Sequence, residues 1–337
     1  MRVSDLGEFP LIERLARLVQ REAHPLPLPD HLSSPLLVGI GDDAAAWRAD
    51  SVVQVFTTDT LVDGVHFRFA QASPWDVGWK GMAVNLSDVA AMGAVPQYAL
   101  VTLGLPLDVP VTWVDDLYRG MLAASSHYGA QIVGGDIVRS PVLFLTVAMT
   151  GVTDLPLLLR SAARPGDAIA VTGPLGGSAG GLRLLEQPSA LPAEVRAALH
   201  EAHYLPKPRV AEGRLLAQEG IRCAMDISDG LLGDLGKLCT ASGVSALIFL
   251  PRVPIHPALR QAFPQEAESL ALSGGEDYEL LFTGPPALVE RLLPRLPPGA
   301  GIIGTIVEGP PGKVRVVRAS GEEVPWASGG WNHLRRP

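Results

Sequence analysis

The stretch Val55 to Phe67 reads Val-Phe-Thr-Thr-Asp-Thr-Leu-Val-Asp-Gly-Val-His-Phe, and it decides how the rest of the chain is interpreted. The apolar run Val52 to Phe56 predicts a buried strand that ends in Thr57, Thr58 and Asp59. Open α/β sheets bind ligands at strand ends, and hydroxyl and carboxylate oxygens are ligands that suit Mg²⁺. Taken alone, the stretch is equally compatible with an Asx or Ser/Thr turn that closes a strand.

The length and composition predict two domains of ordinary size. The chain has 337 residues, of which 47% are hydrophobic, and this length exceeds the usual size of a single core. Strand patterns and helix patterns are interspersed, which indicates a mixed α/β fold. We expect the first domain to span residues 1–151 and the second domain to span residues 152–337.

The charge balance narrows the classes of partner. The chain has 27 Lys plus Arg against 35 Asp plus Glu, and the resulting net charge of −8 argues against nucleic acid or an anionic membrane as partner. An acidic protein can still bind phosphate groups if a divalent cation lies between its carboxylates and the ligand.

The cysteines and the apolar runs predict a soluble cytoplasmic protein. Cys223 and Cys239 are too few and too poorly spaced for a zinc site, so a reducing compartment is the expectation. The amino terminus lacks the apolar segment of a signal peptide, and no run reaches the roughly 18 apolar residues of a membrane span.

Two further predicted strands end in glycine followed by acid. The strand Leu36–Ile40 runs into Gly41-Asp42-Asp43, and the short strand Gln131–Val133 runs into Gly134-Gly135-Asp136. Adjacent acids repel each other unless a positive charge lies between them. The pair Asp42-Asp43, taken alone, is also compatible with an exposed loop of two solvated acids.

A carboxylate lies within the apolar helix predicted for residues 75–93. Asp88 must be exposed, paired or bound to a metal there, because burial of a bare charge costs several kcal/mol. Lys80 lies about two turns upstream on a similar face.

The second half carries a glycine-rich turn and two acid-bearing turns. Gly173 to Gly181 lacks the residues of a P-loop, so we interpret it as tight strand-to-helix packing rather than phosphate capture. In Met225-Asp-Ile-Ser-Asp-Gly-Leu-Leu232, Ser228 and Asp229 are expected to cap a helix over residues 230–241. Ser273-Gly-Gly-Glu-Asp277 is expected to lead into a strand over residues 278–283.

Six motifs in order resemble the thiamine-monophosphate kinases. They are Gly-Asp-Asp43, Thr57-Thr-Asp-Thr with Gly-Val-His-Phe67, Asn85-Leu-Ser-Asp-Val-Ala-Ala-Met-Gly93, Gly-Gly-Asp136, Asp226-Ile-Ser-Asp-Gly230 and Ser273-Gly-Gly-Glu-Asp-Tyr-Glu279. The resemblance covers the chain from Gly7 to Trp331. The Asn-Leu-Ser-Asp and Gly-Gly-Asp elements recur in aminoimidazole ribonucleotide synthetase, selenophosphate synthetase and a hydrogenase maturation factor.

This resemblance implies a two-domain aminoimidazole ribonucleotide synthetase-like fold, a homodimer paired through the amino-terminal domains, and a cleft that holds ATP and several Mg²⁺ ions. The implied metal ligands are Asp43, Thr57, Thr58, Asp59, Asp88, Asp136, Asp226 and Asp229. Five of these ligands are also the expected catalytic residues, namely Asp43, Asp59, Asp88, Asp136 and Asp226. The implied nucleotide contacts are Tyr118, Gly135, Asp136, Arg160 and Ser228, and the implied contacts of thiamine monophosphate are His66, Glu276 and Trp331. Leu334 departs from the aromatic residue common at that position in the family.

The implied reaction fits the chemistry of the residues. Transfer of the γ-phosphoryl group of ATP to a phosphate monoester brings two polyanions together, so acids that hold Mg²⁺ are the natural requirement. The acceptor phosphate has a second pKa of about 6, so direct in-line transfer to give thiamine diphosphate needs no protein base. A related synthetase acting on another substrate, or a non-catalytic nucleotide-binding module, are the alternatives.

Overall fold

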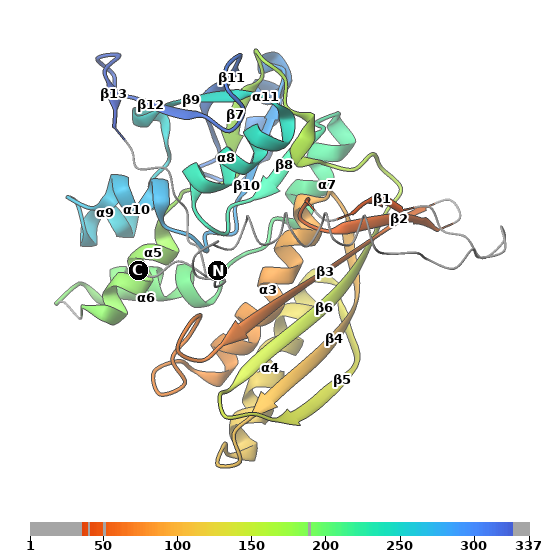
Figure 1. Ribbon diagram of the computed structural model, residues 1–337. Helices are drawn as coiled ribbons and strands as arrows, with labels where there is room; N and C mark the ends of the chain where they lie inside the picture. Colours follow the sequence, from red (N-terminus) through yellow and green to blue (C-terminus); the bar gives the residue numbers. More distant parts are fainter. Residues whose placement is uncertain (1–35, 40, 50–51, 188–189, 326–337) are drawn as a thin grey trace, which may run out of the picture.

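The computed structural model of the chain describes residues 36–39, 41–49, 52–187 and 190–325, and it contains two sheets (Figure 1). A six-stranded sheet has the order β1-β2-β3-β6-β4-β5, and a seven-stranded sheet has the order β13-β12-β9-β11-β7-β10-β8. Each sheet carries helices on a face, so the expectation of a mixed α/β fold with two domains is confirmed.

The first sheet is antiparallel except for its last pair. Only β4 and β5 run parallel to each other. The helices α3 (Pro74–Ala91) and α4 (Val111–Tyr128) cover one face, and side chains along β6 alternate between buried and half-buried positions, as expected for a sheet with one covered face. The strands are β1 (Leu36–Val38), β2 (Ala45–Ala49), β3 (Val52–Val62), β4 (Val95–Leu105), β5 (Gln131–Arg139) and β6 (Phe144–Thr153).

The second sheet is also largely antiparallel, with β9 and β12 as its parallel pair. Its strands are β7 (Ala168–Val171), β8 (Cys223–Asp226), β9 (Ser245–Phe249), β10 (Leu280–Gly284), β11 (Gly301–Val307), β12 (Val314–Val317) and β13 (Glu323–Val324). Its α-helices are α5 (Gly177–Glu186), α6 (Ala193–Tyr204), α7 (Val210–Glu219), α8 (Leu231–Ser242), α9 (Pro257–Ala262), α10 (Ala267–Ser273) and α11 (Pro286–Leu292). The short 3-10 helices are η2 (Arg160–Ala162), η3 (Leu250–Arg252) and η4 (Leu293–Arg295).

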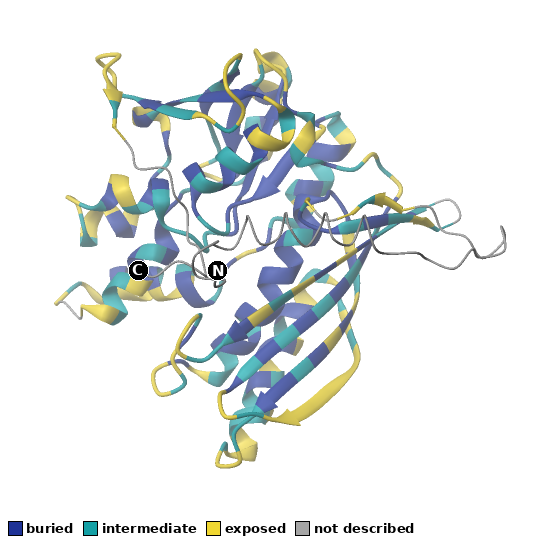
Figure 2. Ribbon diagram, in the orientation of Figure 1, coloured by how far each residue is buried: buried dark blue, intermediate teal, exposed yellow. Residues whose placement is uncertain are grey.

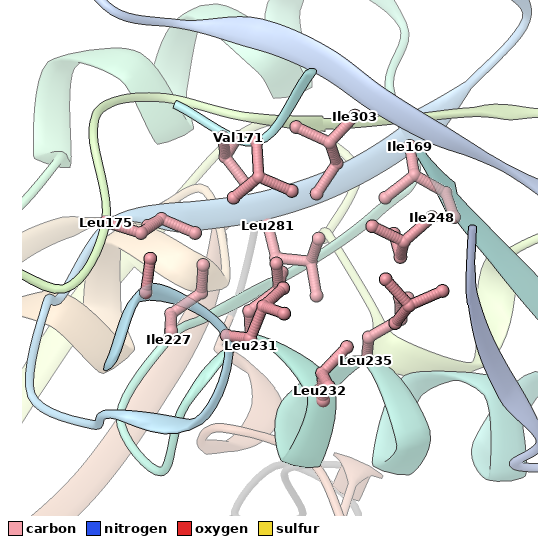
Figure 3. Packing of buried hydrophobic residues seen from close by; sticks show 14 of the residues in the cluster. Ile169, Val171, Leu175, Ile227, Leu231, Leu232, Leu235, Ile248, Leu281 and Ile303 are labelled. Atoms are coloured by element: carbon pink, nitrogen blue, oxygen red, sulfur yellow. The ribbon is translucent and has the colours of Figure 1, made fainter. Parts of the chain in front are cut away.

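Burial gives each domain its own apolar core. In the second domain, leucines of α8 pack against Ile169, Val171 and Leu281 on the sheet (Figure 3). In the first domain, α3 packs against the covered face of β3, β6 and β4. The helix α3 also contacts β8 and α7, so it lies between the two domains.

Two predicted strand ends are wrong, because both strands continue. Thr57, Thr58 and Asp59 lie inside β3 and pair with β6, and Asp136 lies inside β5. Threonine is a favourable strand residue, so the polar run does not end the strand. Since neighbouring strands run mostly in opposite directions, the rule for carboxyl ends of parallel sheets does not bring these residues to one edge.

The strand ends also bear on the predicted domain boundary. The last strand of the first sheet ends at Thr153, and the first strand of the second sheet begins at Ala168. The exact domain boundary, predicted after residue 151, stays a prediction. The apolar spacing from Phe9 to Val19 predicts a helix, and these residues lie outside the described part of the chain. Among the helices that the structure describes, none is long and apolar enough to cross a bilayer.

Candidate active site

The helix α3 carries polar side chains into the space between the domains. Its side chains are buried on nearly all sides, which is typical of a helix enclosed by the protein. Ser73 caps its first turn by accepting a hydrogen bond from the backbone N–H of Asp76, and Pro74 follows at the first helical position. Three of the polar side chains on this helix, Lys80, Ser87 and Asp88, lie against acids of the second domain.

Three carboxylates from three motifs converge at this point. Asp43, Asp88 and Asp226 each offer an oxygen, and these oxygens lie within 4.8 Å of one another; we call these residues the acid cluster. Asp43 follows β1, Asp88 lies on α3 and Asp226 ends β8, so both domains contribute. Hydroxyl groups fix two of the carboxylates: Thr57 donates to Asp88 at 2.5 Å, and Ser87 donates to Asp226 at 2.7 Å.

The electrostatics of the acid cluster call for a cation. Burial, and then the negative charges of Asp59, Asp226 and Asp43, raise the pKa of Asp88 well above its ordinary value. Burial and the charge of Asp43 likewise raise the pKa of Asp226. Like charges this close cannot all remain ionised without a positive charge among them.

Arg160 supplies one positive charge at the edge of the acid cluster. Its guanidinium donates two hydrogen bonds to Asp43, at 3.0 and 2.5 Å, in the forked geometry that arginine favours with carboxylates. Its backbone N–H donates to Asp42 at 3.3 Å. Burial and the charge of Asp43 raise the pKa of Asp42 to about 7. One guanidinium therefore compensates the Asp43 side of the acid cluster and leaves Asp88 and Asp226 repelling each other.

The loop from Gly274 to Glu279 lies against the segment that follows β8. Glu276 and Tyr278 have φ values of 64° and 51°, in the left-handed region of the backbone that residues other than glycine rarely adopt. Backbone hydrogen bonds hold it: the N–H of Glu276 donates to the carbonyl of Ser228 at 2.7 Å, and that of Tyr278 donates to Ile227 at 2.9 Å. Strain of this kind costs about 1–3 kcal/mol per residue and persists where the surroundings impose it.

The three acids of this loop bind to different partners. Glu276 lies 2.9 Å from the ammonium of Lys80 on α3, whereas Glu279 forms a two-bond ion pair with Arg209, at 2.7 and 2.5 Å. Asp277 accepts hydrogen bonds from the backbone N–H groups of Gly176, at 2.7 Å, and Ser178, at 3.4 Å.

Asp277 thereby occupies the amino-terminal end of α5, where a bound phosphate would otherwise lie. A side chain at Gly181 would lie 2.3 Å from the carbonyl oxygen of Leu199 on α6. These contacts confirm the interpretation of the Gly173–Gly181 turn as a packing element.

The prediction that Ser228 and Asp229 cap α8 with their side chains is wrong. The side chains of Ser228 and Asp229 do not cap this helix; instead Asp234, inside its first turn, accepts hydrogen bonds from the backbone N–H groups of Ser228, Asp229 and Gly230, at 3.1, 3.0 and 3.1 Å. Lys237 donates to both Asp234, at 2.8 Å, and Asp229, at 2.5 Å. The segment is therefore held by a buried carboxylate below it, and the side chain of Asp229 is paired with Lys237.

The structure brings together part of the predicted site. Asp43, Thr57, Asp88, Arg160 and Asp226 make the contacts given above. Asp59 acts electrostatically on Asp88, and His66 contributes to lowering the pKa of Glu276, so both belong to this region. Trp331 lies outside the described residues.

Other predicted residues lie elsewhere in the protomer. Thr58 faces the uncovered side of the sheet and donates to the carbonyl of Val147 at 3.0 Å. Asp136 is exposed on the edge strand β5, and β6 and β4 separate that strand from β3, which places it about 14 Å away across the sheet. Gly135 lies beside it, where a side chain would lie 1.8 Å from the carbonyl oxygen of Val101 on β4. Tyr118 packs against the first core from α4.

Sequence analysis placed Lys80 on a face similar to that of Asp88 but did not identify its partner, although a lysine within an apolar helix must find one. It missed His203, Arg209 and Asp234, which hold acids of the loop and the turn before α8.

Comparisons with known proteins agree with this geometry. Residues 41–153 match the family model described as AIR synthase related protein, N-terminal domain, and residues 164–317 match its C-terminal domain. The thiamine-monophosphate kinase of Bacillus subtilis is 40% identical over 73% of this chain and 77% of its own length. That of Mycobacterium tuberculosis H37Rv is 35% identical over 99% of this chain and 94% of its own. The solved structure described as AaThiL complexed with AMPPCP and TMP superposes with a TM-score of 0.85, at 34% identity and 99% coverage of both chains.

Proposed function

This chain belongs to the thiamine-monophosphate kinase family, and we propose that its acid cluster is the place where the γ-phosphoryl group of ATP passes to thiamine monophosphate. The convergence of Asp43, Asp88 and Asp226 within 4.8 Å is the observation that carries the proposal. It joins a helix of the first domain to a strand of the second domain, so the cleft between the domains is the reaction site.

The donor atoms of the acid cluster fit Mg²⁺. They are carboxylate oxygens with the hydroxyl of Thr57 beside them, and oxygen is the ligand that Mg²⁺ requires. The raised pKa values of Asp88 and Asp226 indicate surplus negative charge that a divalent ion would neutralise. When bound, Mg²⁺ neutralises the phosphate oxygens and aligns them for displacement.

The residues of the chain hold and orient the reactants. Arg160 fixes Asp43, while Thr57 and Ser87 fix the carboxylates of Asp88 and Asp226. The acceptor phosphate is an anion above its second pKa of about 6, so it attacks without a protein base. Catalysis then rests on positioning and charge neutralisation.

The test of this function is conversion of substrate and the stereochemistry of transfer. The full chain is incubated with ATP, MgCl₂ and thiamine monophosphate, and thiamine diphosphate is measured by chromatography. ATP that is chiral at its γ-phosphorus should give inversion, because direct transfer is one displacement. Retention, or label trapped on the protein when ATP is supplied alone, would show a phosphoenzyme and refute direct transfer.

We further propose that two copies pair through the uncovered face of the first sheet. Phe56, Tyr98 and Leu100 lie on this face with 42%, 52% and 49% of their surface exposed. Apolar side chains gathered on one sheet face mark an interaction surface. Figure 2 shows the adjoining edge strand β5 almost entirely exposed.

Pairing through this face would explain the position of Asp136. Along the sheet, Asp136 pairs with Thr102, Thr102 with Thr146, and Thr146 with Thr60, so Asp136 shares the uncovered face with Thr58 and Thr60. A second copy placed face to face can bring its Asp136 to the Thr58 side of the first copy, which Asp136 of the same copy cannot reach.

Complementation between inactive variants tests this arrangement. Asp88→Asn and Asp136→Asn chains are co-expressed with different tags, and the mixed dimer is purified by both tags. If Asp136 acts across the dimer, one of the two sites retains both acids, and the mixed dimer should show about half of the wild-type activity. An inactive mixed dimer, or full activity of the Asp136→Asn homodimer, would exclude it.

A further inference from the structure

We propose that Lys80 is a positioning residue for the acceptor, because its ammonium group fixes the Glu276 carboxylate in the orientation that receives the thiamine moiety. The inference rests on the proposed function and deepens it, since it concerns recognition of the acceptor at the far end of the molecule from its phosphate. Lys80 itself touches no substrate in this account and acts through Glu276.

The geometry separates the roles of the two residues. The Lys80 side chain is fully buried, and its Nζ lies 2.9 Å from Oε1 of Glu276. The same ammonium lies 5.8 Å from the centroid of the Tyr204 ring, a cation–π contact from α6. The Glu276 side chain keeps 25% of its surface exposed, while its Oε1 lies against Lys80 and its Oε2 lies 3.6 Å from Nδ1 of His203.

Lys80 is the principal positive charge facing Glu276. Burial acts to raise the pKa of Glu276, but Lys80, His203 and His66 together lower it below its ordinary value. Burial and the neighbouring Lys80 lower the pKa of His203 to about 3, so that ring is neutral at pH 7. The titratable groups that face Glu276 are Lys80 from α3, His203 and Tyr204 from α6, His66 from the loop after β3, and Tyr278 from its own loop.

The backbone of Glu276 supports a positioning role. Its φ of 64° is imposed by the hydrogen bond to Ser228, so the side chain leaves the main chain in a direction that a relaxed loop would not provide. Lys80, which belongs to the first domain, then fixes the position of the Glu276 carboxylate. An anion fixed in this way suits a cationic or amino-bearing heterocycle, which is what the thiamine moiety offers.

The experiment compares Lys80→Met with Arg209→Met over pH 6 to 9. Arg209 is the matched control, because its partner Glu279 belongs to the same loop and their ion pair lies within the second domain. In Lys80→Met, burial still acts to raise the pKa of Glu276, and the largest opposing charge is gone. The KM for thiamine monophosphate should rise roughly tenfold or more at pH 7 and recover toward pH 9, while the KM for ATP stays within about twofold. Lys80→Arg should restore part of the effect.

The outcomes that overturn the inference are specific. An unchanged KM for thiamine monophosphate, or equal and pH-independent changes in both KM values, would assign Lys80 to general stability. If Lys80→Met does not fold, the double variant Lys80→Met/Glu276→Gln replaces the charged pair by neutral groups. Its KM should equal that of Glu276→Gln alone, and a much larger KM would overturn the proposal. Failure of the wild type to form thiamine diphosphate would instead refute the proposed function.

Discussion

Two groups of acids lie where the second domain meets α3, and they are compensated in opposite ways. In the loop Gly274–Glu279, each acid has a partner supplied by the chain: Lys80 for Glu276, backbone N–H groups for Asp277 and Arg209 for Glu279. In the acid cluster, Arg160 forms hydrogen bonds with Asp43 and acts on Asp226 only through its charge, while Asp88 and Asp226 each accept a hydrogen bond from a hydroxyl group.

The difference separates residues that hold the structure from residues that wait for a ligand. An acid with an internal cation contributes to the fold, and removal of its partner leaves a bare buried charge. An acid without an internal cation strains the fold and gains from an external one. The comparison therefore predicts opposite effects on stability and activity at the two places.

The largest effect is expected from Asp88→Asn. Loss of this carboxylate should lower kcat on the order of 10³-fold, about 4 kcal/mol in the barrier, because the charge of the transferring phosphoryl group is no longer neutralised. Without Mg²⁺, the melting temperature should stay the same or rise, since a repelling charge has been removed. Steady-state kinetics and thermal unfolding measure the two quantities.

Asp116→Asn is the control for that variant, because Asp116 forms an exposed pair with Arg119 on α4. It should change neither quantity noticeably. Wild-type activity of Asp88→Asn at low Mg²⁺, or a melting temperature several degrees lower, would mean that Asp88 stabilises the fold rather than binding a ligand.

Arg209→Met should reverse this pattern. The variant leaves Glu279 buried without its cation, and we expect the free energy of unfolding to fall by about 3–5 kcal/mol. At temperatures where the variant is folded, kcat should stay within about twofold of the wild type. Urea unfolding followed by circular dichroism gives the stability, and a loss of kcat without loss of stability would contradict the assignment.

A smaller effect, on pH dependence, is expected at His203. Its pKa is lowered to about 3 in the folded protein, from an ordinary value near 6.5, by burial and by Lys80. The unfolded chain therefore binds a proton between these values and the folded protein does not. Stability is complete above pH 6.5 and is lost as the pH falls, by about 2 kcal/mol between pH 7 and pH 5.

The variant His203→Gln should remove that part of the acid sensitivity, measured as the difference in unfolding free energy between pH 7 and pH 5. His200→Gln, on the same helix but half exposed, is the matched control. An unchanged pH dependence in His203→Gln would mean that His203 is charged in the folded protein and shares the pairing of Glu276 with Lys80.

The sequence predicted the acid cluster better than the elements that carry it. Asp43 and Asp88 stand out in local patterns, because a glycine before an acid or a carboxylate in an apolar helix is visible within a few residues, whereas Asp226 was named by the family resemblance. The helix limits predicted for α3, residues 75–93, were also close to the observed Pro74–Ala91. The strands β3 and β5 were predicted too short, since polar residues inside a strand resemble its end.

The partners of the acids could not be predicted, because they depend on how the domains pack. The pair Lys80–Glu276 joins two domains, and the role of Asp234 depends on a turn that folds back over its own helix. The location of Asp136 required the strand order, in which β6 enters between β3 and β4 although it follows both in sequence.

The position of α3 also has a consequence for which acceptors can react. Lys80 and Asp88 lie eight residues apart on one rigid helix, so the point that orients Glu276 and the point that meets the phosphate are separated by about 12 Å along its axis. The fixed distance along the helix therefore selects acceptors by the distance between their phosphate and the group that Glu276 recognises. A phosphate ester whose recognised group lies much nearer to its phosphate, or much farther from it, would satisfy one end and miss the other.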